Sequence, residues 1–286
     1  MAGPIGSSQF MYNSSGASSF YDYQIEQSAR FDDAGGGTNA SSRLSRTFGT
    51  ASSATKFTFS VWVKRSTTHA NDQNTTWQNI ISRGTGVQGG GSSFGFECGG
   101  GTSGGLTNND RITWYGLKGT SGGTSGGDDR INGFFVDTNN WYHIVIRTDT
   151  TESDAADKLR YYINGDLRTR VSTNALNGDL DRFHATSDEH NIGSTSNGYY
   201  GFGGYMAEFI YADGQSYAPT QFGESKNGVW IPKDPTGTTF GNLGFHLKFE
   251  NASALGNDSS GNDNDWTVAN MGTDHQVLDS PTIGTG

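Results

Sequence analysis

Alternation of apolar and polar residues gives the first clear strand, at residues 56–65. In the run KFTFSVWVKR, phenylalanine or valine occupies every second position. Side chains of a strand point alternately to opposite faces, so this pattern predicts a strand with one buried face. The buried face comprises Phe57, Phe59, Val61 and Val63, and the other face comprises Thr58, Ser60, Trp62 and Lys64.

Further strand-like runs follow at short intervals. Residues 141–149, WYHIVIRTD, are apolar or aromatic on both faces, which is typical of a central strand. Asn164-Gly165 lies between two strand-like runs and predicts a hairpin, because both turn residues need positive φ. We also expect strands in RITWYGL, GYMAEFIYAD, GFHLKFE and DWTVANM, a turn at Asp213-Gly214 and one short helix in PTQFGES.

Composition supports an all-β chain with an aromatic core. Glycine contributes 43 of the 286 residues, which suits tight turns and disfavours long helices. Aromatic residues make up 12% of the chain, and each ring buries a large apolar area. We therefore predict an antiparallel β-sandwich over residues 25–271, preceded by an extended arm, 1–24, and followed by a tail, 272–286.

The net charge, the cysteine content and the length of the apolar runs limit the partners and cross-links that this chain can have. The formal net charge of −10 repels a phosphate backbone, so we expect no nucleic-acid binding. Cys98 is the single cysteine, so no intrachain disulfide can form. No apolar run is long enough to cross a bilayer and the first residues lack a signal-peptide pattern, so we expect neither membrane insertion nor direct secretion.

The order of the motifs resembles a known family. The motifs are QSARFDD, SSRLSRT, KFTFSVWVKRS, WYHIVIRTDTT, RYYINGDLRT and GYMAEFIYADGQ. In this order they resemble the concanavalin A-like lectin/glucanase superfamily in its laminin-G-like form, and particularly proteins of that type encoded by marine bacteriophages. The resemblance covers residues 25–271 and implies a jelly roll.

One segment departs from the usual order of such domains. Residues 245–268 look like the strand and Asp-x-Ser-Gly-Asn turn that usually open the domain, yet here they come last. A circular permutation explains this order, because the first and last strands of a sandwich can be neighbours. We therefore expect the strand near residues 245–250 to pair with the strand near 205–211.

Catalytic patterns are weak. Glucanases of this superfamily resemble one another in a Glu-x-Asp-x-x-Glu motif on a strand, whose carboxylates do the chemistry. The nearest match here, Glu152, Asp154 and Asp157, ends in Asp and lies in a polar connection. Glu208 lies on a predicted strand, but the matching acid of laminin-G-like relatives is usually structural. The six histidines lack metal-site spacing. Since the sequence carries neither the glucanase carboxylate motif nor such a metal-site pattern, we expect no enzyme activity.

Binding residues can be proposed in the loops. A sugar ring stacks on an exposed aromatic ring, and the candidates in or beside loops are Trp77, Trp114, Tyr115, Tyr199 and Tyr200; core packing is the alternative for each. Some relatives bind calcium through loop carboxylates, and Asp128, Asp129, Asp179 and Asp181 offer suitable oxygens. Solvated acids are the alternative there.

The N-terminal arm carries apolar residues in a Ser/Gly-rich segment, which suggests docking on its own domain or on a neighbour. These residues are Phe10, Met11, Tyr12, Phe20, Tyr21 and Tyr23.

The resemblance to phage proteins implies a virion surface protein, assembled in the host cytoplasm, that contacts other virion proteins and binds a host glycan as a tail or fibre adhesin. The alternative is a capsid or tail decoration protein using protein contacts alone. A homotrimer is expected from the habits of phage fibres, and a host-encoded lectin is a third reading.

Overall fold

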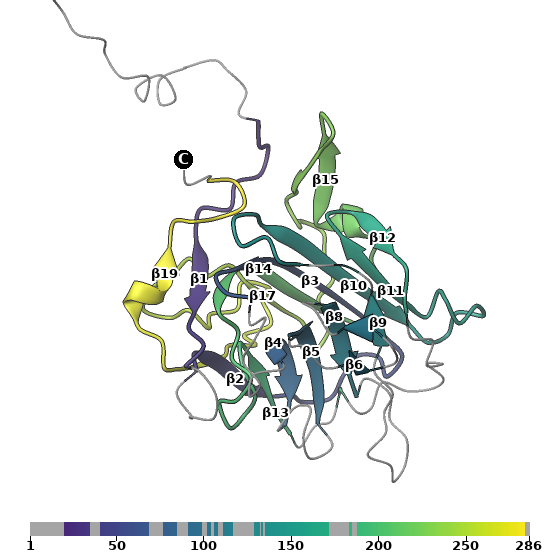
Figure 1. The fold of residues 1–286 in the computed structure, drawn as a ribbon, viewed down its shortest axis with the longest axis horizontal. Helices are drawn as coiled ribbons and strands as arrows, with labels where there is room; N and C mark the ends of the chain where they lie inside the picture. Colours follow the sequence, from purple (N-terminus) through teal and green to yellow (C-terminus); the bar gives the residue numbers. More distant parts are fainter. Residues whose placement is uncertain are drawn as a thin grey trace, which may run out of the picture.

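Two antiparallel sheets packed face to face form the body of the protein in a computed structural model (Figure 1). The structure describes residues 20–34, 41–68, 77–84, 91–98, 102–103, 106–107, 111–116, 129–131, 133, 135–171, 183–184 and 188–283. The predicted all-β sandwich is confirmed. Within these residues, no helix has the length and apolar character needed to span a membrane.

Sheet A, the first sheet, follows the spatial order β12-β11-β10-β3-β14-β1-β19, and β17 also pairs with β14. Its strands are β12 (Asp166–Arg168), β11 (Leu159–Ile163), β10 (Tyr142–Asp149), β3 (Lys56–Arg65), β14 (Gly204–Asp213), β1 (Ser28–Phe31), β19 (Gln276–Val277) and β17 (Phe245–Leu247).

Sheet B, the second sheet, follows the order β18-β2-β13-β4-β5-β8-β9. Its strands are β18 (Thr267–Ala269), β2 (Arg43–Thr47), β13 (Glu189–Ile192), β4 (Trp77–Arg83), β5 (Ser92–Glu97), β8 (Arg111–Tyr115) and β9 (Asp129–Ile131). Smaller elements are the pairs β15 (Gly223–Lys226) with β16 (Val229–Pro232) and β6 (Thr102–Ser103) with β7 (Leu106–Thr107), and the short 3-10 helices η2 (Pro219–Gln221) and η3 (Thr273–His275).

The core lies between the two sheets and is rich in aromatic rings. The alternating face predicted for β3 points into it, where Phe59 lies 4.6 Å from Tyr211, ring centroid to centroid. Phe94, Phe96 and Trp114 enter the same cluster from sheet B. The period-two pattern thus identified the correct buried face.

Local turn signals are also confirmed. Asn164 and Gly165 connect β11 to β12 with φ angles of 50° and 82°, as the predicted hairpin requires. The expected turn after β14 has Gly214 at φ 80°. The short helix expected in PTQFGES is limited to η2, and the residues after it form β15.

The C-terminal strand pairs where the motif order predicted. β17 lies antiparallel to β14, with Phe245 opposite Tyr211 and Leu247 opposite Phe209. The turn after it is organised by the Asp258 carboxylate, which accepts hydrogen bonds from the backbone N–H groups of His246, Ser260 and Asn264 and from the Ser260 hydroxyl.

Residues expected to form a tail extend sheet A instead. β19 pairs with β1 beyond the expected boundary at residue 271. Asp279 accepts hydrogen bonds from Lys64 Nζ at 2.7 Å and Trp141 Nε1 at 3.1 Å. The boundary was placed too early because this segment is held mainly by polar contacts, which leave no apolar periodicity in the sequence.

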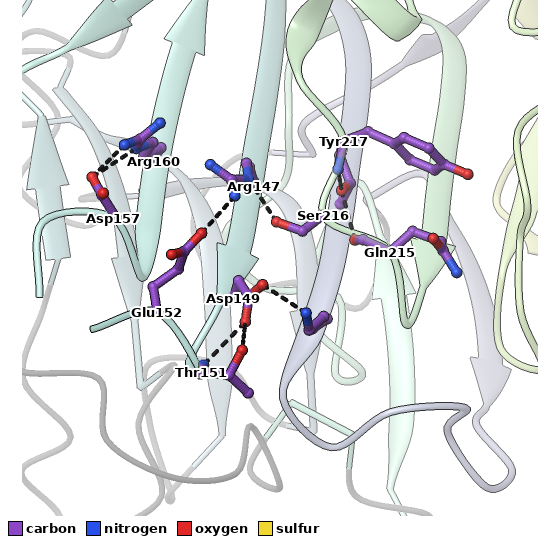
Figure 2. Close-up of polar contacts among 11 residues, drawn as sticks. Arg147, Asp149, Thr151, Glu152, Asp157, Arg160, Gln215, Ser216 and Tyr217 are labelled. Carbon is purple, nitrogen blue, oxygen red and sulfur yellow. Dashed lines mark hydrogen bonds and ion pairs between the residues drawn. The ribbon is translucent and has the colours of Figure 1, made fainter. Parts of the chain in front are cut away.

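A further layer covers the outer face of sheet A, the face directed away from sheet B. Trp230 of β16 and Trp62 of β3 both stack on His143, with centroid distances of 6.0 and 4.5 Å. Residues 215–217 are also fixed to sheet A, because Thr58 Oγ1 of β3 donates to the Gln215 carbonyl and accepts from the Tyr217 N–H. Gln215 and Tyr217 are labelled in Figure 2. The β15–β16 hairpin projects from this layer (Figure 1).

Candidate functional site on the outer face of sheet B

The face of sheet B directed away from the core carries many polar side chains, although most of them are buried. Phe94, Phe96, Ile112 and Trp114 point into the core, so their neighbours on β5 and β8 point outward. Residues directly opposite in an antiparallel pair share a face. Three rows therefore cross β4, β5 and β8: Trp77 with Glu97 and Arg111, Asn79 with Gly95 and Thr113, and Ser82 with Ser93 and Tyr115. We call these nine residues, with Asn191 of β13, the polar face.

Two of the predicted glycan-binding aromatics meet on this face. The rings of Trp77 and Tyr115 lie 6.4 Å apart at an interplanar angle of 75°. Between their rows lies Gly95, where a Cβ would be 2.0 Å from the carbonyl oxygen of Gln78. Only glycine fits there, because any side chain would collide with this carbonyl.

Trp114 lies in the core, contrary to its prediction as a glycan-binding residue beside a loop. Its ring is fully buried in the core between Phe57 and Phe94, and its Nε1 donates to Ser92 Oγ at 2.9 Å. The surrounding glycine-rich sequence suggested a loop edge, but Trp114 has the inward parity of β8. Trp77 is outward-facing yet only 8% exposed.

Three polar side chains of this face are buried and unpaired within the described part of the chain. Both amide atoms of Asn79 and Asn191, and the hydroxyl of Ser93, have no hydrogen-bond partner there, and all three residues are at most 1% exposed. Asn191 is opposite Ser82, which in turn is opposite Ser93, so the groups lie on neighbouring strands. Buried polar groups are nearly always paired, so these atoms indicate a place where water or ligand hydroxyls bind.

Charge on the polar face is concentrated at Glu97. Its carboxylate accepts from Thr113 Oγ1 at 3.0 Å, and pairs with Arg130 Nε at 3.1 Å and Arg111 Nη2 at 3.8 Å. The two arginines therefore hold the Glu97 carboxylate in a fixed position and compensate its negative charge. Glu97 is the one acidic residue on strands β4, β5 and β8, all of whose residues the structure describes.

Tyr199 and Tyr200 lie at the border of the polar face. The Tyr200 carbonyl accepts a hydrogen bond from the Asn79 N–H at 2.9 Å, so their loop runs beside β4. Tyr200 has a φ of 55°, and Tyr199 is 41% exposed. The structure thus brings Trp77, Tyr115 and this loop around Asn79.

The proposed calcium ligands do not form a site in the described part of the chain. Asp129 is buried and its carboxylate is bound by the guanidinium of Arg170, with Nε 3.0 Å from each oxygen. Burial raises the pKa of Asp129, and Arg170 opposes this rise. Asp128, Asp179 and Asp181 lie outside the described residues, among which no group of three or more metal-binding side chains occurs.

The glucanase-like acids lie in the connection between β10 and β11, as the sequence predicted. Figure 2 shows Glu152 paired with Arg147 at 2.9 Å and Asp157 paired with Arg160. Asp154 accepts the Ala156 N–H within its own turn. These carboxylates are engaged in separate structural contacts.

The described part of the arm docks on its own domain. The Tyr23 hydroxyl donates to Glu208 Oε1 at 3.1 Å, and Asp22 pairs with Lys226 of β15 at 2.9 Å. Phe20 packs edge-on against Tyr21 and remains 40% exposed. Phe10, Met11 and Tyr12 lie outside the described residues.

Sequence reasoning missed the polar groups Asn79, Asn191, Ser93 and Glu97. Alternation in SSFGFE and RITWY assigns Ser93 and Glu97 to the outward face. No sequence signal separates such residues from ordinary solvated ones, because their burial depends on contacts between distant segments.

Comparisons with known proteins agree with this architecture. A family model described as the concanavalin A-like lectin/glucanases superfamily matches residues 35–216. No curated protein matches the chain. A solved structure from Bacteroides ovatus, provisionally described as a carbohydrate binding protein, is 18% identical with a TM-score of 0.53, over 87% of this chain. This chain spans 61% of that protein's length, and the likeness shows the fold.

More distant structures share less. The CBM40 module of Ruminococcus gnavus IT-sialidase, bound to α2,3-sialyllactose, is 17% identical with a TM-score of 0.36, covering 54% of this chain and 75% of that one. The enzymatically active domain of tailspike protein 2 of bacteriophage CBA120 is 14% identical with a TM-score of 0.42, covering 65% and 25%. Neither likeness supports an inference about this chain.

Proposed function

This chain belongs to the concanavalin A-like lectin/glucanases superfamily, and from that premise we propose that it binds a glycan on the polar face of sheet B without cleaving it. The observation that carries the proposal is the set of buried groups of Asn79, Asn191 and Ser93, which are unpaired within the described residues. Amide and hydroxyl groups both donate and accept, as sugar hydroxyls do. The Tyr115 ring, which is half-buried and packs edge-on against the buried Trp77, supplies the apolar surface on which a sugar ring stacks.

The absence of hydrolysis is part of the proposal. A retaining glycosidase needs two carboxyl groups about 5–5.5 Å apart on either side of the scissile bond. On β4, β5 and β8, which the structure describes in full, the polar face has a single carboxylate, that of Glu97. Arg130 and Thr113 hold this carboxylate in place. A single, compensated carboxylate suits recognition of a hydroxyl better than acid–base catalysis.

The role we propose for this binding is adhesion by a phage virion, at a tail or fibre, with host surface glycan and other virion proteins as partners and a trimer as the assembly. Support comes from the motif resemblance and the docked N-terminal arm. The alternative, decoration of a capsid or tail, is favoured by two exposed apolar residues beside Lys226. Val229, opposite Lys226 in the hairpin, is 51% exposed, and the Phe20 ring lies 5.9 Å from Lys226 Nζ.

A glycan array with the whole chain, followed by titration of the best ligand, tests the binding site. Asn79→Ala and Asn191→Ala remove amides that have no partner among the described residues, so we expect unchanged or higher stability. We expect each variant to weaken binding at least about tenfold, equivalent to about 1.4 kcal/mol.

Ser28→Ala, on β1 of sheet A, is the matched control outside the polar face. The buried Ser28 hydroxyl donates to the Asp279 carbonyl at 2.6 Å, so its loss lowers stability by about 1 kcal/mol and leaves affinity unchanged. Failure of the wild-type chain to bind any arrayed glycan, or full binding by both asparagine variants, would refute the proposal. Release of reducing sugar would refute the non-catalytic part alone.

A further inference from the structure

A pocket lies in the layer that covers the outer face of sheet A. Its volume is about 340 Å³, and its lining includes Tyr23 of the arm, Asp234, Phe240, His246 of β17, Lys248 and Ser259. Binding pockets begin at about this size, which suits a single sugar ring. The pocket shares no residue with the polar face of sheet B.

An unusual backbone geometry supports its wall. β14 carries a bulge between Ala207 and Ile210, and Glu208 within it has a φ of 48°. A bulge re-aims side chains, and a non-glycine residue at positive φ persists only where its surroundings hold it. Here Glu208 is held from both sides, by the Tyr23 hydroxyl at 3.1 Å and by His246 Nε2 at 2.6 Å.

The Glu208 contact fixes the His246 ring and leaves its other nitrogen unused. Nε2 faces Glu208, and Nδ1 has no hydrogen-bond partner among the residues that the structure describes. His246 is only 4% exposed and lines the pocket. An oriented, buried ring with one unengaged nitrogen is a directional polar contact for a ligand.

Other lining groups are unengaged too. In the same described region, neither Lys248 Nζ nor Ser259 Oγ has a hydrogen bond or ion pair. Asp234 accepts from Thr236 through Oδ1, so its Oδ2 remains available. Phe240, parallel to His246 at a centroid distance of 6.2 Å, adds an apolar surface.

The balance of these groups selects the ligand class. Among the described residues one lysine, Lys248, and one carboxylate, Asp234, line the pocket, so an ion of either sign meets a like charge. A neutral molecule rich in hydroxyl groups can donate to Asp234 and accept from Lys248 and Ser259 at once. We propose that this pocket binds one neutral sugar unit, as a second saccharide site on the opposite side of the sandwich from the first.

The test uses the full chain and NMR saturation transfer with methyl glycosides of glucose, galactose, mannose and N-acetylglucosamine. Glucuronate and N-acetylneuraminate form the acidic arm. Two variants probe the pocket: Ser259→Trp fills it with a bulky ring, and Lys248→Met removes a donor while keeping most of the length of the stem. We expect at least one neutral glycoside to bind, with a loss of at least about tenfold in Ser259→Trp and about fivefold in Lys248→Met.

Asn79→Ala is the control that separates the two sites, and thermal melting verifies folding. If Ser259→Trp is misfolded, Lys248→Met decides. If both pocket variants still bind the glycoside and Asn79→Ala does not, the sugar binds at the polar face alone. This result overturns the inference and leaves the first site intact. Binding of acidic sugars alone, or of no sugar, overturns it as well.

Discussion

The indole Nε1–H of Trp230 donates a hydrogen bond to Nδ1 of His143 over 2.9 Å. An indole nitrogen can only donate, so His143 Nδ1 is the acceptor and its ring proton is on Nε2. Nε2 lies 2.8 Å from Ser60 Oγ and therefore donates to it. His143 in this form cannot take the Ser60 proton, so the pair fastens the β15–β16 hairpin to sheet A and does not form a nucleophile.

This buried histidine predicts loss of stability in acid. Burial lowers the pKa of His143 to about 3 and that of His190 to about 4. Both titrate near a pKa of about 6.5 in an unfolded chain. Between these values the unfolded state binds more protons, so the free energy of unfolding falls as the pH drops below about 6.5. Each pH unit costs up to about 1.4 kcal/mol per histidine.

Urea unfolding at about pH 7, 6 and 5 measures this slope. His143→Gln removes one of the two groups, so its slope is shallower than the wild type even though its stability at neutral pH is lower. An unchanged slope in His143→Gln contradicts the assignment of His143 as a buried neutral ring.

Gly165 allows Trp230 to reach His143. Gly165 has a φ of 82°, and a Cβ there would lie 2.4 Å from the Trp230 ring. Gly228 in the neighbouring hairpin has nearly the same φ, 81°, and a Cβ there would have no described atom within 4 Å. Gly228→Ala therefore costs backbone strain of about 1 kcal/mol, and Gly165→Ala costs at least about 2 kcal/mol more. Equal melting temperatures for the two variants would show that the ring contact is unimportant.

Asp258 organises the last turn of the domain. Asp258→Ala leaves three backbone N–H groups without their acceptor, so we expect a loss of about 3 kcal/mol or more. Glu250→Ala, at an exposed position in the same segment, is the control and changes stability by less than about 0.5 kcal/mol. Chemical denaturation measures both. A small effect of Asp258→Ala contradicts the assigned role of this turn.

Trp114 and Trp77 should separate stability from binding. Trp114→Phe shrinks a fully buried side chain and removes its bond to Ser92, so it lowers stability by about 2–3 kcal/mol without changing affinity per folded molecule. Trp77→Phe lowers glycan affinity, because its ring lies on the proposed binding face. Titration and thermal melting of both variants give the comparison; affinity loss confined to Trp114→Phe contradicts the outward placement of the site.

Sequence reasoning succeeded where the determining interactions are local. The faces of β3 follow from alternation, and the Asn164-Gly165 hairpin follows from positive φ at adjacent residues. Motif order, a non-local signal, also placed β17 beside β14. It failed at Trp114, because glycine-rich flanks resemble a loop regardless of the strand between them, and at β19, which polar contacts hold in place.

The sequence by itself determined the fold class, most strands and which side chains of each strand share a face, because the two-residue period is a property of the extended backbone. Only the tertiary structure decided that Asn79, Ser93 and Asn191 meet on one buried surface. β4 and β5 are neighbours in the chain, but β13, which carries Asn191, comes from a distant part of it, and its register against β4 is set by core packing between the sheets. The same long-range pairing brings Tyr23 and His246 to Glu208 from opposite ends of the sequence.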